Sequence, residues 1–171
     1  ARCPVLMFGD DVWREGAGAE AVRLAEALEA PVFSSRQIFV NFPSRHPLYC
    51  GMYPVSAEFK TTTGLEPDLI FLVGCQGVHG PVTEPGVMQI GPNPVLMGRH
   101  YPLDVAAQCE LRETLSSLTA ALTSLHPADR AAAWKRERAQ VRAYARRLIQ
   151  REENLVREHE HDTTVHPSLL E

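Results

Sequence analysis

Short, wholly apolar runs alternate with amphipathic stretches along the first 125 residues. The run Val5-Leu6-Met7-Phe8 is closed by Gly9-Asp10-Asp11. A brief apolar run bounded by turn residues is typical of a strand buried on both faces, as in a parallel sheet. The same criterion predicts further strands at 31–34, 68–74, 87–90 and 104–107, of which 68–74 has the clearest pattern.

Helical periodicity appears between these runs. Residues 18–29 are expected to form a helix whose apolar stripe holds Ala21, Val22, Ala25 and Leu28, with Glu20, Arg23 and Glu26 on the polar side. A second helix is expected near 55–62. Leucines spaced by four and three residues predict a third, and they are Leu111, Leu115, Leu118, Leu122 and Leu125. Residues 35–54 show no clean period and are interpreted as a long, mostly ordered loop.

Alternating strands and helices predict an α/β fold with a doubly wound, mostly parallel sheet and right-handed crossovers. This Rossmann-like unit is expected to span residues 1–126. Residues 127–171 are a charged helical segment: 128–161 carry nine of the seventeen Lys and Arg residues. Apolar residues recur there every seven positions, at Trp134, Val141, Leu148 and Leu155, and this stripe needs a surface to pack on.

Composition narrows the classes of function. The 171 residues are 44% hydrophobic with a net charge of -4, and six acidic residues interleave the basic ones of 128–161, so nucleic acid is a poor candidate partner. No apolar run approaches the roughly 20 residues that cross a bilayer, so no membrane association is expected. Four cysteines lack CxxC spacing, which disfavours structural zinc and predicts reduced thiols in a cytoplasmic protein.

The first strand-to-helix turn lacks the glycines of a nucleotide site. A dinucleotide fingerprint needs G-x-G-x-x-G, whereas here Asp10 and Asp11 follow Gly9 directly, and their charge would repel a diphosphate. There is no G-x-x-x-x-G-K-[ST] segment. The chain also lacks a G-D-G segment followed by N-N, the pattern that holds magnesium at a diphosphate cofactor, so it is not expected to hold such a cofactor alone.

Among the histidines, His79 is the strongest candidate for chemistry, because it follows the clearest strand, where ligands bind in such sheets. A pairing of Cys75 with His79 has no third residue to orient it. His46 lies in a proline-rich loop. The remaining candidates are interpreted as loop or solvated residues, namely His100, His126, His159 and His161.

Four segments together resemble the central domain of the thiamine-diphosphate decarboxylase and acetolactate-synthase superfamily. They are RCPVLMFG at 2–9, AEALEAPV at 25–32, FPSRHPLYCGM at 42–52 and PDLIFLVG at 67–74. Family members show R-P-V-I-L-x-G, L-A-E-x-L-x-A-P-V, F-P-x-x-H-P-x-x-G and A-D-L-I-L-x-L-G in that order. The third segment is most similar to benzoylformate decarboxylase.

The resemblance implies a parent enzyme that uses thiamine diphosphate and Mg²⁺, bound by domains other than this one. It implies a catalytic glutamate in the N-terminal domain and assembly of the parent as a dimer or tetramer. Residues 127–171 would then lead to the cofactor-binding domain. The chain is accordingly expected to be a central domain cut from a longer enzyme, with the N- and C-terminal domains of that enzyme as its partners.

Two departures from the family pattern bear on ligands. The I-D-x-D-P segment that lines the nucleotide groove of FAD- or ADP-binding members is replaced by Ile90-Gly91-Pro92-Asn93-Pro94, which argues against a flavin. Benzoylformate decarboxylase contributes a catalytic histidine from the loop after Gly74. Alignment on Glu84-Pro85-Gly86 puts Pro81 at that position and His79 two residues earlier, so His79 is the candidate catalytic residue, acting only in the full-length enzyme.

The leading hypothesis is a structural and interface domain of a 2-oxo acid decarboxylase or carboligase, inert by itself. The alternative is a domain that still binds FAD or ADP, as in acetolactate synthase-like enzymes. A self-contained enzyme built on His79 is a third hypothesis.

Overall fold

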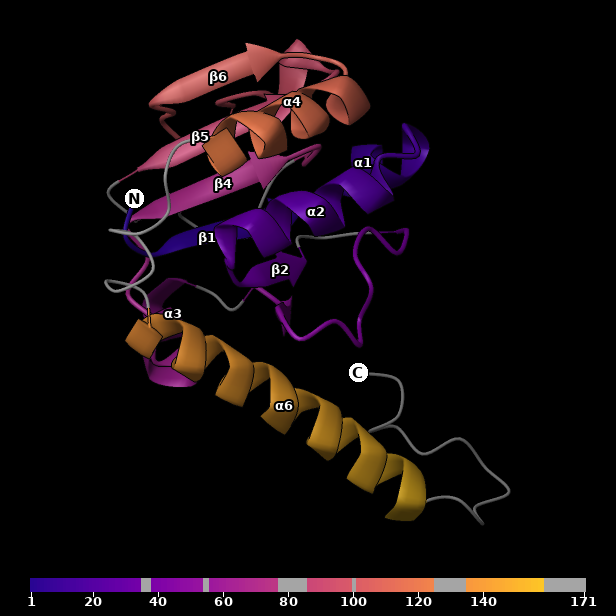
Figure 1. The fold of residues 1–171 in the computed structure, drawn as a ribbon, viewed down its shortest axis with the longest axis vertical. Helices are drawn as coiled ribbons and strands as arrows, with labels where there is room; N and C mark the ends of the chain where they lie inside the picture. The colour runs from indigo at the N-terminus through magenta and orange to yellow at the C-terminus, as the bar shows by residue number, and fades with distance from the viewer. Residues whose placement is uncertain (35–37, 54–55, 77–85, 100, 125–134, 159–171) are drawn as a thin grey trace.

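The computed structural model describes residues 1–34, 38–53, 56–76, 86–99, 101–124 and 135–158. Its centre is a six-stranded sheet in the order β3-β2-β1-β4-β5-β6, with every neighbouring pair parallel (Figure 1). The strands are β1 (Pro4–Phe8), β2 (Val32–Ser34), β3 (Tyr49–Met52), β4 (Leu69–Val73), β5 (Val87–Gly91) and β6 (Val105–Gln108). The strand order reverses between β1 and β4, and this is the point at which such sheets bind ligands.

Helices lie on both faces of the sheet, which confirms the doubly wound α/β prediction. They are α1 (Asp10–Arg14), α2 (Gly18–Leu28), α3 (Ser56–Thr63), α4 (Leu111–Ser124) and α6 (Lys135–Glu158), with a short 3-10 turn, η1 (Pro94–Leu96). Phe71 and Ile90 share one face, which α2 and α4 cover. Phe33 lies on the opposite face, where its ring centroid is 5.2 Å from that of Phe59 in α3.

Apolar strand side chains form the centre of the core, and buried helix residues such as Leu24, Leu111 and Leu115 belong to the same cluster. Val5, Leu6, Met7, Val32 and Leu72 have no exposed surface. This is why the central strands read as continuous apolar runs: both faces of a parallel sheet are covered, so neither alternates with polar residues.

Three local predictions were wrong. The predicted loop 35–54 contains strand β3, whose register shifts against β2 and whose Gly51 has φ 77°, so it lacks a clean strand pattern. The five-residue helix α1 begins directly at Asp10, inside the predicted turn. Glu20, assigned to the polar side of α2, is buried, with its carboxylate 2.8 Å from Arg23 and 3.7 Å from Arg112 of α4.

The charged helix predicted at 128–161 is observed as α6; 128–134, including Trp134, and 159–161 lie outside the described residues. Val141 and Ala145 are buried, and a Leu148 methyl group lies 3.4 Å from the position of a Cβ on Gly51 of β3. The stripe therefore packs on the β3 edge of the same domain. The later turns of α6 continue past the sheet (Figure 1).

Substitution of Gly9 tests how closely β1 and β4 approach. A Cβ on Gly9 would lie 2.3 Å from the carbonyl oxygen of Gly74 and 2.5 Å from Cα of Cys75, both of which are backbone atoms that cannot rotate away. We expect Gly9→Ala to lower the free energy of unfolding by about 2 kcal/mol or more in denaturant titrations.

Gly18→Ala is the matched control. Nothing lies within 4 Å of its added Cβ, and Gly18 begins α2. This change should be neutral or stabilise by roughly 0.5 kcal/mol. Equal effects of the two substitutions would contradict the close approach at Gly9.

Candidate functional site

The candidate site lies at the carboxyl ends of β1 and β4. The Gly9 N–H donates to the Val73 carbonyl oxygen at 2.9 Å, and the Asp11 N–H donates to that of Gly74 at 3.2 Å. Gly74 has φ 62°, a conformation that favours glycine, and a Cβ there would be 2.9 Å from a Leu111 methyl group. The two strands therefore turn against each other with no room for side chains at either glycine.

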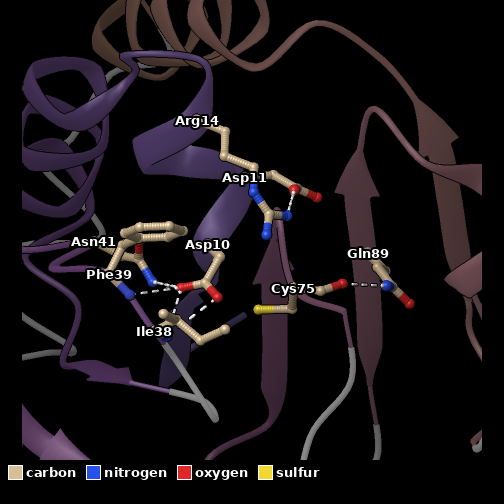
Figure 2. A network of polar contacts seen from close by, with 8 residues as sticks. All are labelled: Asp10, Asp11, Arg14, Ile38, Phe39, Asn41, Cys75 and Gln89. Atoms are coloured by element: carbon tan, nitrogen blue, oxygen red, sulfur yellow. Dashed lines mark hydrogen bonds and ion pairs between the residues drawn. The ribbon is translucent and has the colours of Figure 1, made fainter.

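Asp10 projects from this turn toward the segment that follows β2 (Figure 2). Its carboxylate accepts hydrogen bonds from the backbone N–H groups of Ile38 at 3.0 Å and Phe39 at 3.1 Å. The side-chain amide of Asn41 donates to it at 3.2 Å. Asp10 is 7% exposed. The carboxylate thus holds residues 38–41 against the end of β1.

This environment keeps Asp10 ionised. Burial disfavours the charged form, but the hydrogen bonds from Asn41, Phe39 and Ile38 outweigh it, and the Arg14 guanidinium adds to them. The pKa of Asp10 is therefore below its ordinary value of 3.8. Its neighbour Asp11 instead pairs with Arg14 at 3.0 Å (Figure 2).

Aromatic rings lie beside the Asp10 carboxylate. Trp13 and Phe39 stack with centroids 4.2 Å apart and planes 8° from parallel. The Arg14 guanidinium carbon is 5.8 Å from the Phe39 centroid. The chain's own carboxylate, amides and rings thus occupy the edge beyond β1 and β2, next to the strand reversal at which such sheets bind ligands.

The N-terminus of α4, where an anion could bind, is also occupied by the protein's own groups. The Leu111 N–H donates to the Glu15 carboxylate at 2.6 Å, and the Glu113 N–H donates to the Glu110 carboxylate at 2.8 Å. These carboxylates accept the backbone N–H hydrogen bonds that a bound phosphate would need. A diphosphate would have to displace them.

On the other side of the strand reversal, a buried amide joins β5 to β4. The Gln89 side chain donates to the Cys75 carbonyl oxygen at 3.1 Å and accepts from the Gly98 N–H at 3.3 Å (Figure 2 shows the first contact). The Cys75 thiol is buried and donates to the Met7 carbonyl oxygen at 3.2 Å. Gly91 and Asn93 stand where the family pattern has aspartates, and Asn93 caps η1 instead.

His79, the predicted catalytic residue, lies outside the described residues, so its role stays a prediction, and the disfavoured pairing with Cys75 is not tested. The same holds for His100, His126, His159 and His161. His46 is described and has a structural role. Its Nδ1 accepts from the Leu48 N–H at 3.2 Å, which places the ring proton on Nε2, 3.3 Å from the Glu26 carboxylate.

The described part of the chain offers no group of three or more His, Cys, Asp or Glu residues arranged for a metal ion. The acidic residues discussed above are engaged by backbone amides or arginines, so they do not fit a magnesium–diphosphate site. None of the described helices is long and apolar enough to cross a membrane.

The sequence points to Asp10 and Asp11 but does not show what Asp10 binds. Ile38, Phe39 and Asn41 lie in a stretch without periodicity, 28 to 31 positions along the chain. The one available signal was two acidic residues directly after a buried strand, where a carboxylate needs hydrogen-bond donors nearby.

Comparison with known proteins identifies the domain. The family model described as the thiamine pyrophosphate enzyme central domain matches residues 1–118. The chain belongs to this family. The match covers the sheet, α2 and most of α4, and the resemblance inferred from the four sequence segments is confirmed.

Individual relatives are much longer than this chain. A Methanocaldococcus jannaschii protein named "Probable acetolactate synthase large subunit" is 29% identical over 74% of the chain and 23% of its own length. The thiamine diphosphate-dependent 4-hydroxybenzoylformate decarboxylase of Rhodococcus jostii RHA1 has TM-score 0.59 and 27% identity over 74% of the chain and 25% of its own. A candidate thiamin diphosphate-dependent enzyme from Mycobacterium smegmatis has TM-score 0.59 and 28% identity, over 70% of this chain and 25% of its own length. The chain therefore spans about a quarter of each relative.

Removal of the Asp10 carboxylate should release residues 38–41. We expect Asp10→Ala to lower the free energy of unfolding by about 1–3 kcal/mol in urea titrations, because two backbone amides and Asn41 lose their acceptor. Asp11→Asn is the control. It removes an ion pair with a half-exposed guanidinium and should cost no more than about 1 kcal/mol. Equal losses would contradict the role given to Asp10.

The lowered pKa of Asp10 predicts the pH dependence of stability. A carboxyl whose folded-state pKa is depressed stabilises the protein above its unfolded-state pKa. That contribution disappears as the pH falls through the lower folded-state pKa, so it is complete above about pH 4 and lost below. Urea titrations from about pH 6 down to about pH 2 should show a smaller loss of stability for Asp10→Asn than for the unmodified chain. Parallel curves of unfolding free energy against pH for the two proteins would contradict the lowered pKa of Asp10.

Proposed function

We propose that this domain is the structural and interface domain of a thiamine-diphosphate-dependent 2-oxo acid decarboxylase or carboligase, without turnover of its own. The observation that carries the proposal is the family match over residues 1–118, in a domain whose ligand-binding edge is filled by its own groups. The likeness to a 4-hydroxybenzoylformate decarboxylase at 27% identity supports the choice of reaction class.

In this proposal the cofactor and Mg²⁺ are bound by other domains of the enzyme. When bound by those domains, thiamine diphosphate would supply the electron sink for decarboxylation. The residues described here have a structural role. The Gly9–Gly74 contact fixes the carboxyl ends of β1 and β4 against each other, and Asp10 holds the segment after β2 in place. Residues 127–171 would connect to the cofactor-binding domain, with α6 anchored on β3 through Val141 and Ala145.

His79 has a conditional place in the proposal. In the sequence it follows β4, where ligand-binding loops are expected in such sheets, and it would contribute to catalysis only in the complete enzyme. FAD is not expected to bind, because Asp10, Glu15 and Glu110 occupy the hydrogen-bonding groups near its expected position.

Turnover assays of the purified chain test the proposal. With thiamine diphosphate, Mg²⁺ and either pyruvate or benzoylformate, we expect no release of carbon dioxide above the protein-free rate. With FAD, we expect colourless protein and an unchanged unfolding midpoint. The complete enzyme, assayed in parallel, should decarboxylate a 2-oxo acid. Turnover by the chain alone, or a complete enzyme indifferent to thiamine diphosphate, would overturn the proposal.

A further inference from the structure

A large apolar cavity lies between the sheet and the two helices that cover one of its faces. Its volume is about 680 Å³. Leu28 of α2 and Leu118 and Leu122 of α4 line it from the helix side, and side chains of β1, β4, β5 and β6 line it from the sheet side. Figure 1 shows α2 and α4 next to each other over these strands. We call this space the interlayer cavity.

The interlayer cavity lies at the opposite end of the sheet from Asp10. Pro4, Leu69 and Val105 line it, and they are the first residues of β1, β4 and β6. Leu28, which also lines it, is the last residue of α2. The crevice in which open parallel sheets bind ligands is at the carboxyl ends of the strands. The cavity is therefore separate from the candidate site described above.

The leucine stripe of α4 shows how the cavity arises. Leu111 and Leu115 have no exposed surface, whereas Leu118 and Leu122 are half-buried and line the cavity. The helix thus packs closely on the sheet over its first turns and leaves space beside its later ones. Ala107 of β6 is too small to fill that space. Apolar atoms that line an unfilled cavity lack dispersion contacts on one side, so a molecule that fits there gains them.

The lining selects the chemistry of an occupant. All twelve described residues that line the cavity are apolar, and Phe71 is the one aromatic residue among them. A polar group inside would lose its hydrogen bonds to water without finding new ones from these side chains. The volume is within the range of ligand pockets and several times the roughly 150 Å³ of a cavity that binds benzene.

The shape favours a chain over a ring system. The cavity crosses four neighbouring strands, β1, β4, β5 and β6, so it extends over about 14 Å at the usual spacing between strands. Its depth is limited to the space between one sheet and one helix layer. A long, shallow space with a mainly aliphatic lining matches an unbranched hydrocarbon chain.

We propose that the interlayer cavity binds the hydrocarbon chain of an aliphatic molecule, an acid or an alcohol, whose polar end stays outside in water. This inference is independent of the proposed function. It concerns a face and an end of the sheet that the candidate site does not use.

Calorimetric titration of the 171-residue chain with octanoate, decanoate and decanol tests the proposal. We expect saturable binding at one site. Decanoate should bind about tenfold more tightly than octanoate, because two further methylene groups become buried. Decanol should bind about as tightly as decanoate, because the polar end makes no contact inside the cavity.

Two neighbouring residues of β6 provide a matched pair of variants. Ala106 and Ala107 are both exposed, and successive side chains of a strand point to opposite faces, so only Ala107 lines the cavity. Ala107→Phe should weaken decanoate binding at least tenfold, and Ala106→Phe should leave it unchanged. Val105→Gln, which adds a polar group to the lining, should weaken binding to a similar extent. Circular dichroism checks that each variant folds.

Four results would overturn the proposal. Octanoate and decanoate could bind equally, which would exclude burial of the chain. Decanoate could bind without decanol, which would locate the site at a charged surface. The two phenylalanine variants could have equal effects. The complete enzyme could fail to bind decanoate while the 171-residue chain binds it, which would assign the cavity to another part of the polypeptide. None of these measurements depends on turnover, so failure of the proposed reaction would appear separately, in the decarboxylation assay.

Discussion

The close approach of β1 and β4 at Gly9 and Gly74 is the constraint on which the rest of this edge depends. Backbone meets backbone there, with the Asp11 N–H donating to the Gly74 carbonyl oxygen at 3.2 Å. The chain enters α1 directly after this contact. Asp10, the first residue of α1, is thereby directed toward the segment after β2.

The position of Asp10 affects whether the carboxyl edge of the sheet can bind a ligand. In open parallel sheets the reversal of strand order leaves a crevice for ligands. Here an ionised carboxylate lies beside that reversal, on the β2 side of β1, and its charge is satisfied by two backbone amides and Asn41. The same hydrogen bonds present Ile38 and Val40 to solvent.

An element could be predicted from the sequence where residues close together in the chain are enough to make it form. Strands β1 and β4 were predictable because burial on both faces leaves an unbroken apolar run, and α4 because its leucines repeat with the helical period. Strand β3 was missed because it contains Gly51 at positive φ and an irregular register, and its stability comes from β2 and from α6 packing on it. Glu20 was placed in solvent because its neighbour Arg112 belongs to another helix, 92 positions away.

The sequence by itself determined the family, the alternation of strands and helices, and the absence of a phosphate-binding glycine motif, because these depend on residue order and short-range periodicity. Only the tertiary structure decided that Asp10 is buried, ionised and bound to residues 38–41, and that the stripe of α6 packs on its own domain. Partners of a polar group or a helix face are chosen by three-dimensional proximity. A periodic pattern shows that such groups need partners without identifying them.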